Sequence, residues 1–136
     1  KTNTLTGTST AGSIAVTGEG NSTTTNLQQG LCKAWCNLDG GTVDSNVDLT
    51  GVRDSFNISS VEDVSTGSVK TTYTNNMGND DYAGSALARQ SSSGDDAFVR
   101  FSNVFSTSQT RYVCVDNGGT SRDGETQTVL THGDLA

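Results

Sequence analysis

The chain has 136 residues, a formal net charge of −7, an apolar share of 31%, 16 glycines and no proline. Its length fits one domain with at most a short arm, and its apolar share is far below the roughly 45–50% usual for soluble domains, so a thick self-sufficient core is not expected. The balance of 8 Lys and Arg against 15 Asp and Glu argues against nucleic acid as a partner, and the lack of an apolar run of roughly 18–20 residues argues against membrane insertion.

The composition favours strands over helices. Ser, Thr, Asn and Gly are abundant, and all four are poor in helix interiors. Thr and Val fit a pleated surface, while Gly, Asn and Asp form turns. The chain begins at Lys1 rather than Met, so we expect a processed product or the end of a longer polypeptide, without a basic-then-apolar signal peptide.

The first 30 residues form a separate compositional unit. Leu5-Thr6-Gly7 and Val16-Thr17-Gly18 repeat one signature in a stretch otherwise rich in Thr, Ser, Gly and Asn. Such a segment has too few apolar groups to offset its own ordering entropy within one chain. We therefore predict an extended Thr/Ser/Gly-rich arm over residues 1–30, ordered by pairing with something else, with a flexible linker as the alternative.

The next segment changes from helical to strand spacing. Leu27, Leu31 and Ala34 recur at helical intervals after a possible cap at Asn26, which predicts a short helical turn. From Lys33 onward, apolar residues alternate with polar ones until the turn at residues 39–41, which predicts a strand.

The clearest pattern in the middle of the chain is a hairpin. Phe56 and Ile58 alternate with polar residues, as do Val69 and Tyr73, on either side of Ser65-Thr66-Gly67-Ser68. Further strands are predicted over residues 82–89, 97–105, 110–116 and 126–132. Short strands at this spacing predict an all-β fold, an antiparallel β-sandwich or jelly-roll-like domain over residues 31–136.

Nucleophilic and metal chemistry find little support in the sequence. Cys32, Cys36 and Cys114 have the wrong spacing for zinc sites built on two-residue gaps, so we expect them to be small buried hydrophobes with free thiols. A dyad of Cys114 with His132 is disfavoured, because Cys114 lies between two valines in a strand pattern. We predict no catalytic residue, no metal and no cofactor.

The acidic turns are the candidate ligand-binding loops. The adjacent pairs Glu62-Asp63, Asp80-Asp81 and Asp95-Asp96 fall in turn-like segments, where carboxylates generally face water. Calcium at Asn79, Asp80 and Asp81 is a minor hypothesis, because the spaced acidic pattern of a defined calcium loop is absent. We single out Asn79, Asp80, Asp81, Asp95 and Asp96 as candidate ligand-binding positions.

The large aromatic and branched side chains are the candidate packing positions. Trp35 is the one tryptophan, and we expect it in the core or at a subunit interface, with sugar stacking as the alternative. Phe56, Ile58 and Tyr73 are assigned to the same packing or interface role.

Several separated motifs between residues 27 and 136 resemble one family. They are Gly30-Leu31-Cys32-Lys33-Ala34-Trp35, an Asn-x-Asp-Gly turn, Arg53-Asp54-Ser55-Phe56-Asn57-Ile58-Ser59-Ser60-Val61, Thr66-Gly67, Tyr73-Thr74, Met77, Tyr82 and His132-Gly133-Asp134-Leu135-Ala136. In this order they resemble a domain at the C-terminal end of tail-fibre-like virion proteins of marine tailed phages. Family members commonly carry Val and Phe at Cys36 and Leu38, and the stretch from Cys114 to Gln127 matches poorly.

The resemblance implies a structural protein of the virion and no named chemistry. We expect a non-enzymatic tail-fibre or appendage domain for host attachment, a homotrimer whose partners are copies of itself, other virion proteins and host-surface polysaccharide. The alternative is a capsid decoration or cement protein that binds other capsid subunits. An enzyme acting on polysaccharide would need two carboxylates brought together in space.

Overall fold

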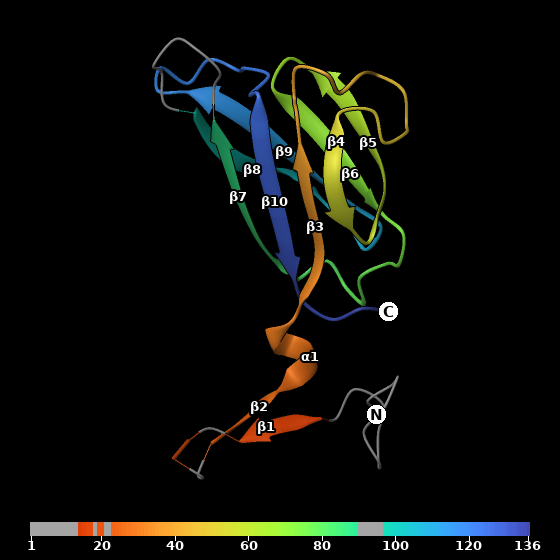
Figure 1. Ribbon diagram of the computed structural model, residues 1–136, viewed down its shortest axis with the longest axis vertical. Helices are drawn as coiled ribbons and strands as arrows, with labels where there is room; N and C mark the ends of the chain where they lie inside the picture. Colours follow the sequence, from red (N-terminus) through yellow and green to blue (C-terminus); the bar gives the residue numbers. More distant parts are fainter. Residues whose placement is uncertain (1–13, 18, 21–22, 90–96) are drawn as a thin grey trace.

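The computed structural model describes residues 14–17, 19–20, 23–89 and 97–136, most of which form two packed antiparallel sheets (Figure 1). The strands of this sandwich are β3 (Cys32–Leu38), β4 (Val52–Phe56), β5 (Ile58–Ser65), β6 (Ser68–Tyr73), β7 (Ala83–Arg89), β8 (Ala97–Phe105), β9 (Gln109–Asp116) and β10 (Thr126–His132). The front sheet has the order β4-β3-β10-β7 and the back sheet has the order β5-β6-β9-β8. The predicted all-β antiparallel sandwich is confirmed.

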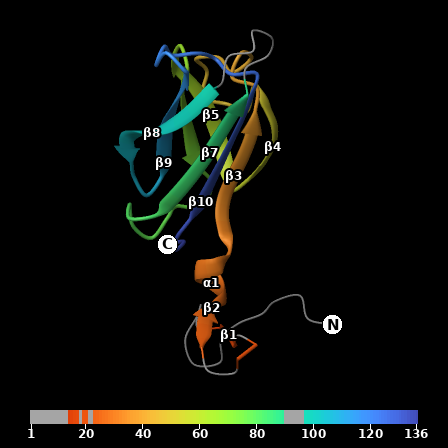
Figure 2. The same ribbon diagram turned by 90° about the vertical axis from the view of Figure 1, so that its left-hand side faces the viewer.

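A short arm precedes the sandwich and projects from one end of it (Figures 1 and 2). β1 (Ala15–Thr17) and β2 (Thr24–Asn26) pair antiparallel, and α1 (Leu27–Gly30) joins them to β3. The expected helical turn is present, and the Asn26 side chain caps it by accepting a hydrogen bond from the Gln28 N–H. The part of the predicted arm before Ile14, including the first repeat, lies outside the described residues.

The strand predictions hold closely where polar and apolar residues alternate. β8 and β10 have the predicted bounds, β9 begins one residue earlier than expected and β7 one residue later. β5 and β6 form the predicted hairpin around Thr66 and Gly67, where Gly67 has a φ of 72°. This conformation favours glycine, and the Cys114 carbonyl oxygen would lie 2.6 Å from an added Cβ.

The prediction that Phe56 and Ile58 share one strand is wrong. Asn57 separates them with a φ of 59°, a left-handed conformation that Asn tolerates better than most residues. Phe56 therefore ends β4 in the front sheet, whereas Ile58 begins β5 in the back sheet. Asn57 is the corner at which the chain crosses between the sheets.

The space between the sheets holds a mixed apolar and hydroxyl core. Its main apolar cluster contains Cys36, Leu38, Val43, Val61, Val69, Tyr112 and Val129. Thr71, Thr110 and Thr131 are also fully buried beside them. Because threonine carries a methyl group and can bond to backbone carbonyls, as Thr71 Oγ1 does to the Thr110 oxygen at 3.4 Å, it fills the interior in place of larger hydrophobes.

A second cluster closes the end of the sandwich nearest the arm. Tyr73, Met77 and Tyr82 are buried there with Ala34. The ring centroids of Tyr73 and Tyr82 lie 6.0 Å apart in an edge-on arrangement, which is a favourable geometry for aromatic pairs. Both clusters lie within one chain, so the sandwich has its own core despite the low apolar content.

The turn after β9 is built around the carboxylate of Asp116. Its Oδ1 accepts the Gly118 and Thr120 N–H groups, each at 2.9 Å, and its Oδ2 accepts Arg122 Nε at 3.1 Å. These donors, with the Thr120 N–H as the largest contributor, lower the pKa of Asp116 below its usual value.

Acid should therefore weaken this turn. A folded-state pKa below the unfolded one means that the unfolded chain takes up the proton first, so the stabilisation is complete above about pH 4 and is lost as the pH falls through the lowered pKa. Asp116→Asn should lack this component. We expect denaturant unfolding from pH 7 to 2 to show a smaller loss of stability in the variant, and equal losses would contradict the assignment. Burial raises the pKa of Asp63, so protonation of this group favours the folded state as the pH falls. Because this contribution is present in both proteins, the difference between wild type and Asp116→Asn reports on Asp116.

Candidate functional site

The cysteine and histidine considered for nucleophilic catalysis do not meet. Cys114 lies against Gly124, just before the start of β10, whereas His132 ends that strand, about 20 Å away by strand geometry. Burial raises the pKa of the Cys36 thiol to about 12 and also raises that of Cys114. The three cysteines are free, and Cys36 and Cys114 are buried as expected, while Cys32 is only half-buried.

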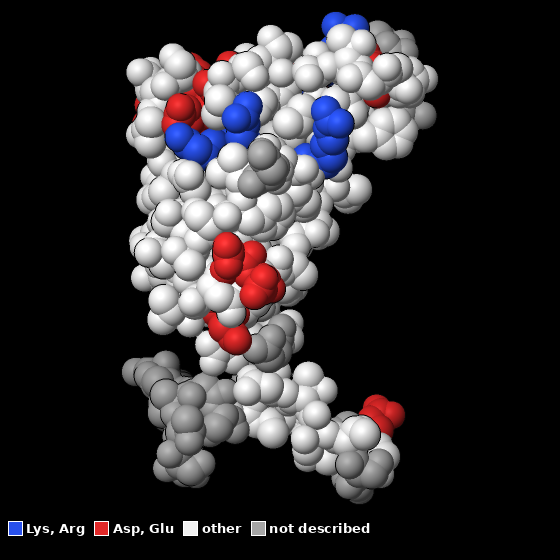
Figure 3. All heavy atoms as spheres, turned by 180° about the vertical axis from the view of Figure 1, so that it is seen from behind, with Lys and Arg blue, Asp and Glu red and all other residues white. Residues whose placement is uncertain are grey.

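The acidic loop proposed for ligands lies at the arm end of the sandwich and is solvent-exposed. Asp80 and Asp81 face water, and Asn79 Oδ1 accepts the Asp81 N–H at 3.0 Å, which is a local turn. Acidic groups also lie on the lower part of the face in Figure 3. Among the described residues, no group of three or more His, Cys, Asp or Glu side chains is placed to hold a metal. Asp95 and Asp96 lie outside the described residues.

The predicted packing residues divide between the interior and the surface. Tyr73 is buried, and Ile58 is half-buried against both core clusters. Trp35 alternates with the buried residues Ala34 and Cys36, so it stands on the outer face of the front sheet. Phe56, which pairs with Trp35 in register, is 52% exposed.

Two further apolar side chains extend this outer face. Leu130 lies directly opposite Trp35 on the other neighbouring strand and is half-buried. Leu87 follows on the edge strand β7 and is 74% exposed. We call Phe56, Trp35, Leu130 and Leu87 the apolar face. It crosses every strand of the front sheet, and large exposed apolar areas of this kind mark interaction sites.

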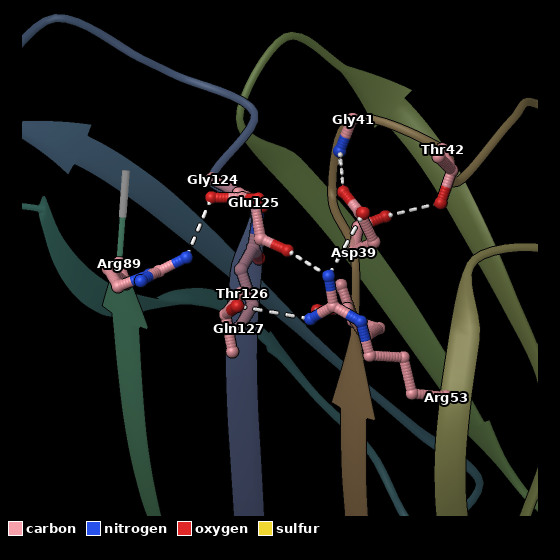
Figure 4. Close-up of polar contacts among 10 residues, drawn as sticks. Asp39, Gly41, Thr42, Arg53, Arg89, Gly124, Glu125, Thr126 and Gln127 are labelled. Atoms are coloured by element: carbon pink, nitrogen blue, oxygen red, sulfur yellow. Dashed lines mark hydrogen bonds and ion pairs between the residues drawn. The ribbon is translucent and has the colours of Figure 1, made fainter. Parts of the chain in front are cut away.

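Beyond the apolar face, towards the end of the sandwich remote from the arm, the same sheet carries an ion-pair network (Figure 4). Arg53 pairs with Asp39 at 3.0 Å and donates to Thr126 Oγ1 at 3.0 Å and to the Glu125 carbonyl oxygen at 2.8 Å. Arg89 pairs with the Glu125 carboxylate at 2.9 Å. Each exposed pair contributes little alone, but together they tie all four strands at this end and leave both arginines engaged.

The outer face of the back sheet is basic. Lys70 on β6 lies opposite Arg111 on β9, and Arg100 on β8 pairs in register with Val113, two residues along β9 from Arg111. Lys70 and Arg111 alternate with buried residues of their strands, and Arg100 lies between Val99 and Phe101, which are half-buried against the core. These three side chains therefore share the outward face. Figure 3 shows the basic side chains crossing the upper part of this face. We call Lys70, Arg111 and Arg100 the basic face.

Sequence reasoning missed the basic face because it depends on strand order. The alternation within each strand shows that these side chains point outward, but only the pairing of β6 with β9 and of β9 with β8 makes them neighbours. The low total of basic residues also directed attention to the acidic loops.

Comparison of the chain with family models, curated proteins and solved structures finds no match. Within the described part of the chain, no helix is long and apolar enough to cross a bilayer.

Proposed function

We propose that this chain is a structural protein of a phage virion, a tail-fibre or appendage domain that assembles with copies of itself and serves attachment to the host surface. The apolar face carries the assembly part of the proposal, and the motif series across residues 27–136 supports the place in the virion. The occupant of the apolar face in this proposal is a second copy of the chain. The homotrimer is one of the closed symmetric assemblies open to such a chain, and we propose it because the resemblance to phage appendages implies it.

The size of the face explains why the arm belongs to the same assembly. The front sheet has three strands of seven residues and one of five. At about 3.3 Å per residue and about 4.8 Å between strands, its whole outer surface is roughly 410 Å² in projection. A stable interface buries about 800 Å² on each partner. The arm supplies further area, because its hairpin strands are exposed along their whole length and Val16 and Leu31 are about half exposed.

Native mass spectrometry and sedimentation of the purified chain test the assembly. We expect a trimer for wild type and a shift to monomer when Phe56 and Leu87 are both replaced by Ser, with the apparent dissociation constant raised at least about tenfold, because these two exposed side chains provide apolar area that assembly would remove from water. Val47→Ser is the matched control, since Val47 is 63% exposed but lies in the loop before β4.

A wild-type chain that remains monomeric at every concentration would refute the self-assembly proposal. Loss of the trimer in the Val47→Ser control, with no loss in the double variant, would place the interface elsewhere.

The alternative role is capsid decoration, in which the same face binds other capsid subunits. Decoration requires hundreds of copies in each particle, whereas a fibre requires tens at most.

A further inference from the structure

Resting on the attachment role proposed above, we propose that the basic face binds an anionic glycan through its sulfate or carboxylate groups. The exposed carboxylates of Asp80 and Asp81 have the wrong charge for such a ligand, and their loop lies at the arm end of the sandwich (Figure 1). The basic face lies on the body of the sandwich instead, on the sheet that does not carry the apolar face.

Among the described residues, the arginines without a carboxylate partner are concentrated on the basic face. Arg53, Arg89 and Arg122 each have a carboxylate partner, and the buried Lys33 ammonium donates to the Gln28 carbonyl oxygen. Within the described part of the chain, Arg100 and Arg111 are the arginines that have no carboxylate partner. Both lie on the basic face, in a protein of net charge −7.

The basic face contains a like-charge contact that lowers the stability of the fold. Lys70 and Arg111 are direct cross-strand partners, and like charges in this position repel each other. Glu62 pairs with Lys70 from the other side, which offsets part of the repulsion but leaves Arg111 unpaired. Local arrangements that oppose stability are typical of functional sites.

The guanidinium groups of Arg111 and Arg100 are placed to bind paired oxygens. Arg111 Nε donates to Ser68 Oγ at 2.7 Å, which holds the guanidinium over the sheet and leaves its terminal nitrogens to donate elsewhere. A guanidinium fork matches the paired oxygens of a carboxylate or sulfate. Arg100 stands one strand away, so two such forks can engage successive charged groups of one polymer.

An exposed aromatic ring completes the face. Phe98 precedes Arg100 by two residues on β8, shares its outward side and is 54% exposed. Its register partner Val115 is half-buried on the same side of the sheet, so the ring has an apolar neighbour. A flat ring beside the arginines offers contact to the apolar side of a sugar. The combination favours a glycan over duplex DNA, because three cations on a protein of net charge −7 neutralise few phosphates.

Binding of fluorescent dextran sulfate, polygalacturonate and neutral dextran to the assembled chain tests this inference. We expect saturable binding to one or both anionic polymers, weakened by salt, and none to neutral dextran. The double variant Arg100→Gln and Arg111→Gln should bind at least about 100-fold more weakly, about tenfold for each lost charge-assisted contact. Phe98→Ala should weaken binding of the anionic polymers without changing its salt dependence.

Arg89→Gln is the matched control, because it removes the same charge from an exposed arginine on the other sheet. It should leave the affinity unchanged, and cooperative thermal unfolding of each variant, with a midpoint near or above that of wild type, shows that its fold is intact. Absence of binding to both anionic polymers, an equal loss in the Arg89 control, or equally tight binding of a DNA duplex would overturn the inference. Trimer formation is measured separately, so a trimer that binds no glycan refutes this inference alone, whereas a monomer that binds glycan refutes the proposed assembly alone.

Discussion

Tyr112→Ala is expected to destabilise the sandwich by about 3–5 kcal/mol, the cost of removing a large ring from a packed interior. Tyr112 is fully buried in the main apolar cluster between the sheets. It lies on β9, which pairs with both β6 and β8, so a cavity there weakens the centre of the back sheet. Equilibrium unfolding in urea measures the change.

Tyr112→Phe separates the ring from its hydroxyl group. Within the described part of the chain, the Tyr112 hydroxyl has no hydrogen-bond partner, and burial raises the pKa of the phenol well above its usual value, so it stays neutral. Removing an unsatisfied buried polar group should leave stability unchanged or raise it by up to about 1 kcal/mol. A loss in Tyr112→Phe as large as that in Tyr112→Ala would contradict this description of the core.

Asn57→Ala is expected to cost about 2–4 kcal/mol, because it strains the corner between the sheets and removes its hydrogen bonds. Asn57 Oδ1 accepts the Asn75 N–H at 2.7 Å, and Nδ2 donates to the Lys33 and Asn75 carbonyl oxygens at 3.0 Å each. The side chain therefore joins β3, the corner and the loop after β6.

Asn57→Gly tests the two contributions separately. Glycine accepts the φ of 59° without strain but makes none of the side-chain hydrogen bonds. We expect it to cost about 1–2 kcal/mol, less than alanine at the same position. Thermal or urea unfolding gives both values, and a glycine variant less stable than the alanine variant would show that the left-handed conformation is not what Asn57 provides.

The sequence predicts the strands of this fold where polar and apolar residues alternate, as in β8 and β10. It does not predict β4, because Arg53, Asp54 and Ser55 have no apolar alternation and pair with β3 only through tertiary structure. The corner at Asn57 is not predicted for a related reason, because asparagine is common both in turns and next to strands. Its left-handed φ is held by hydrogen bonds to Lys33 and Asn75, which are distant in sequence.

The nature of the core and of the surfaces was still harder to predict. Buried Thr71, Thr110 and Thr131 resemble any exposed strand threonine in the sequence, so the low apolar content overstated how thin the core is. The apolar and basic faces arise from pairs such as Trp35 with Leu130 and Lys70 with Arg111, which lie far apart along the chain. Single-strand alternation identifies the outward side chains, and only strand order makes them neighbours.

Quantitative mass spectrometry and antibody labelling of virions, purified from the culture that produces this chain, test the proposed role in a virion most directly. We expect the chain in every particle, in tens of copies and in a multiple of three, with the label at the tail. Hundreds of copies on the capsid shell would contradict the fibre role in favour of decoration, and absence of the chain from intact virions would contradict the proposed function altogether.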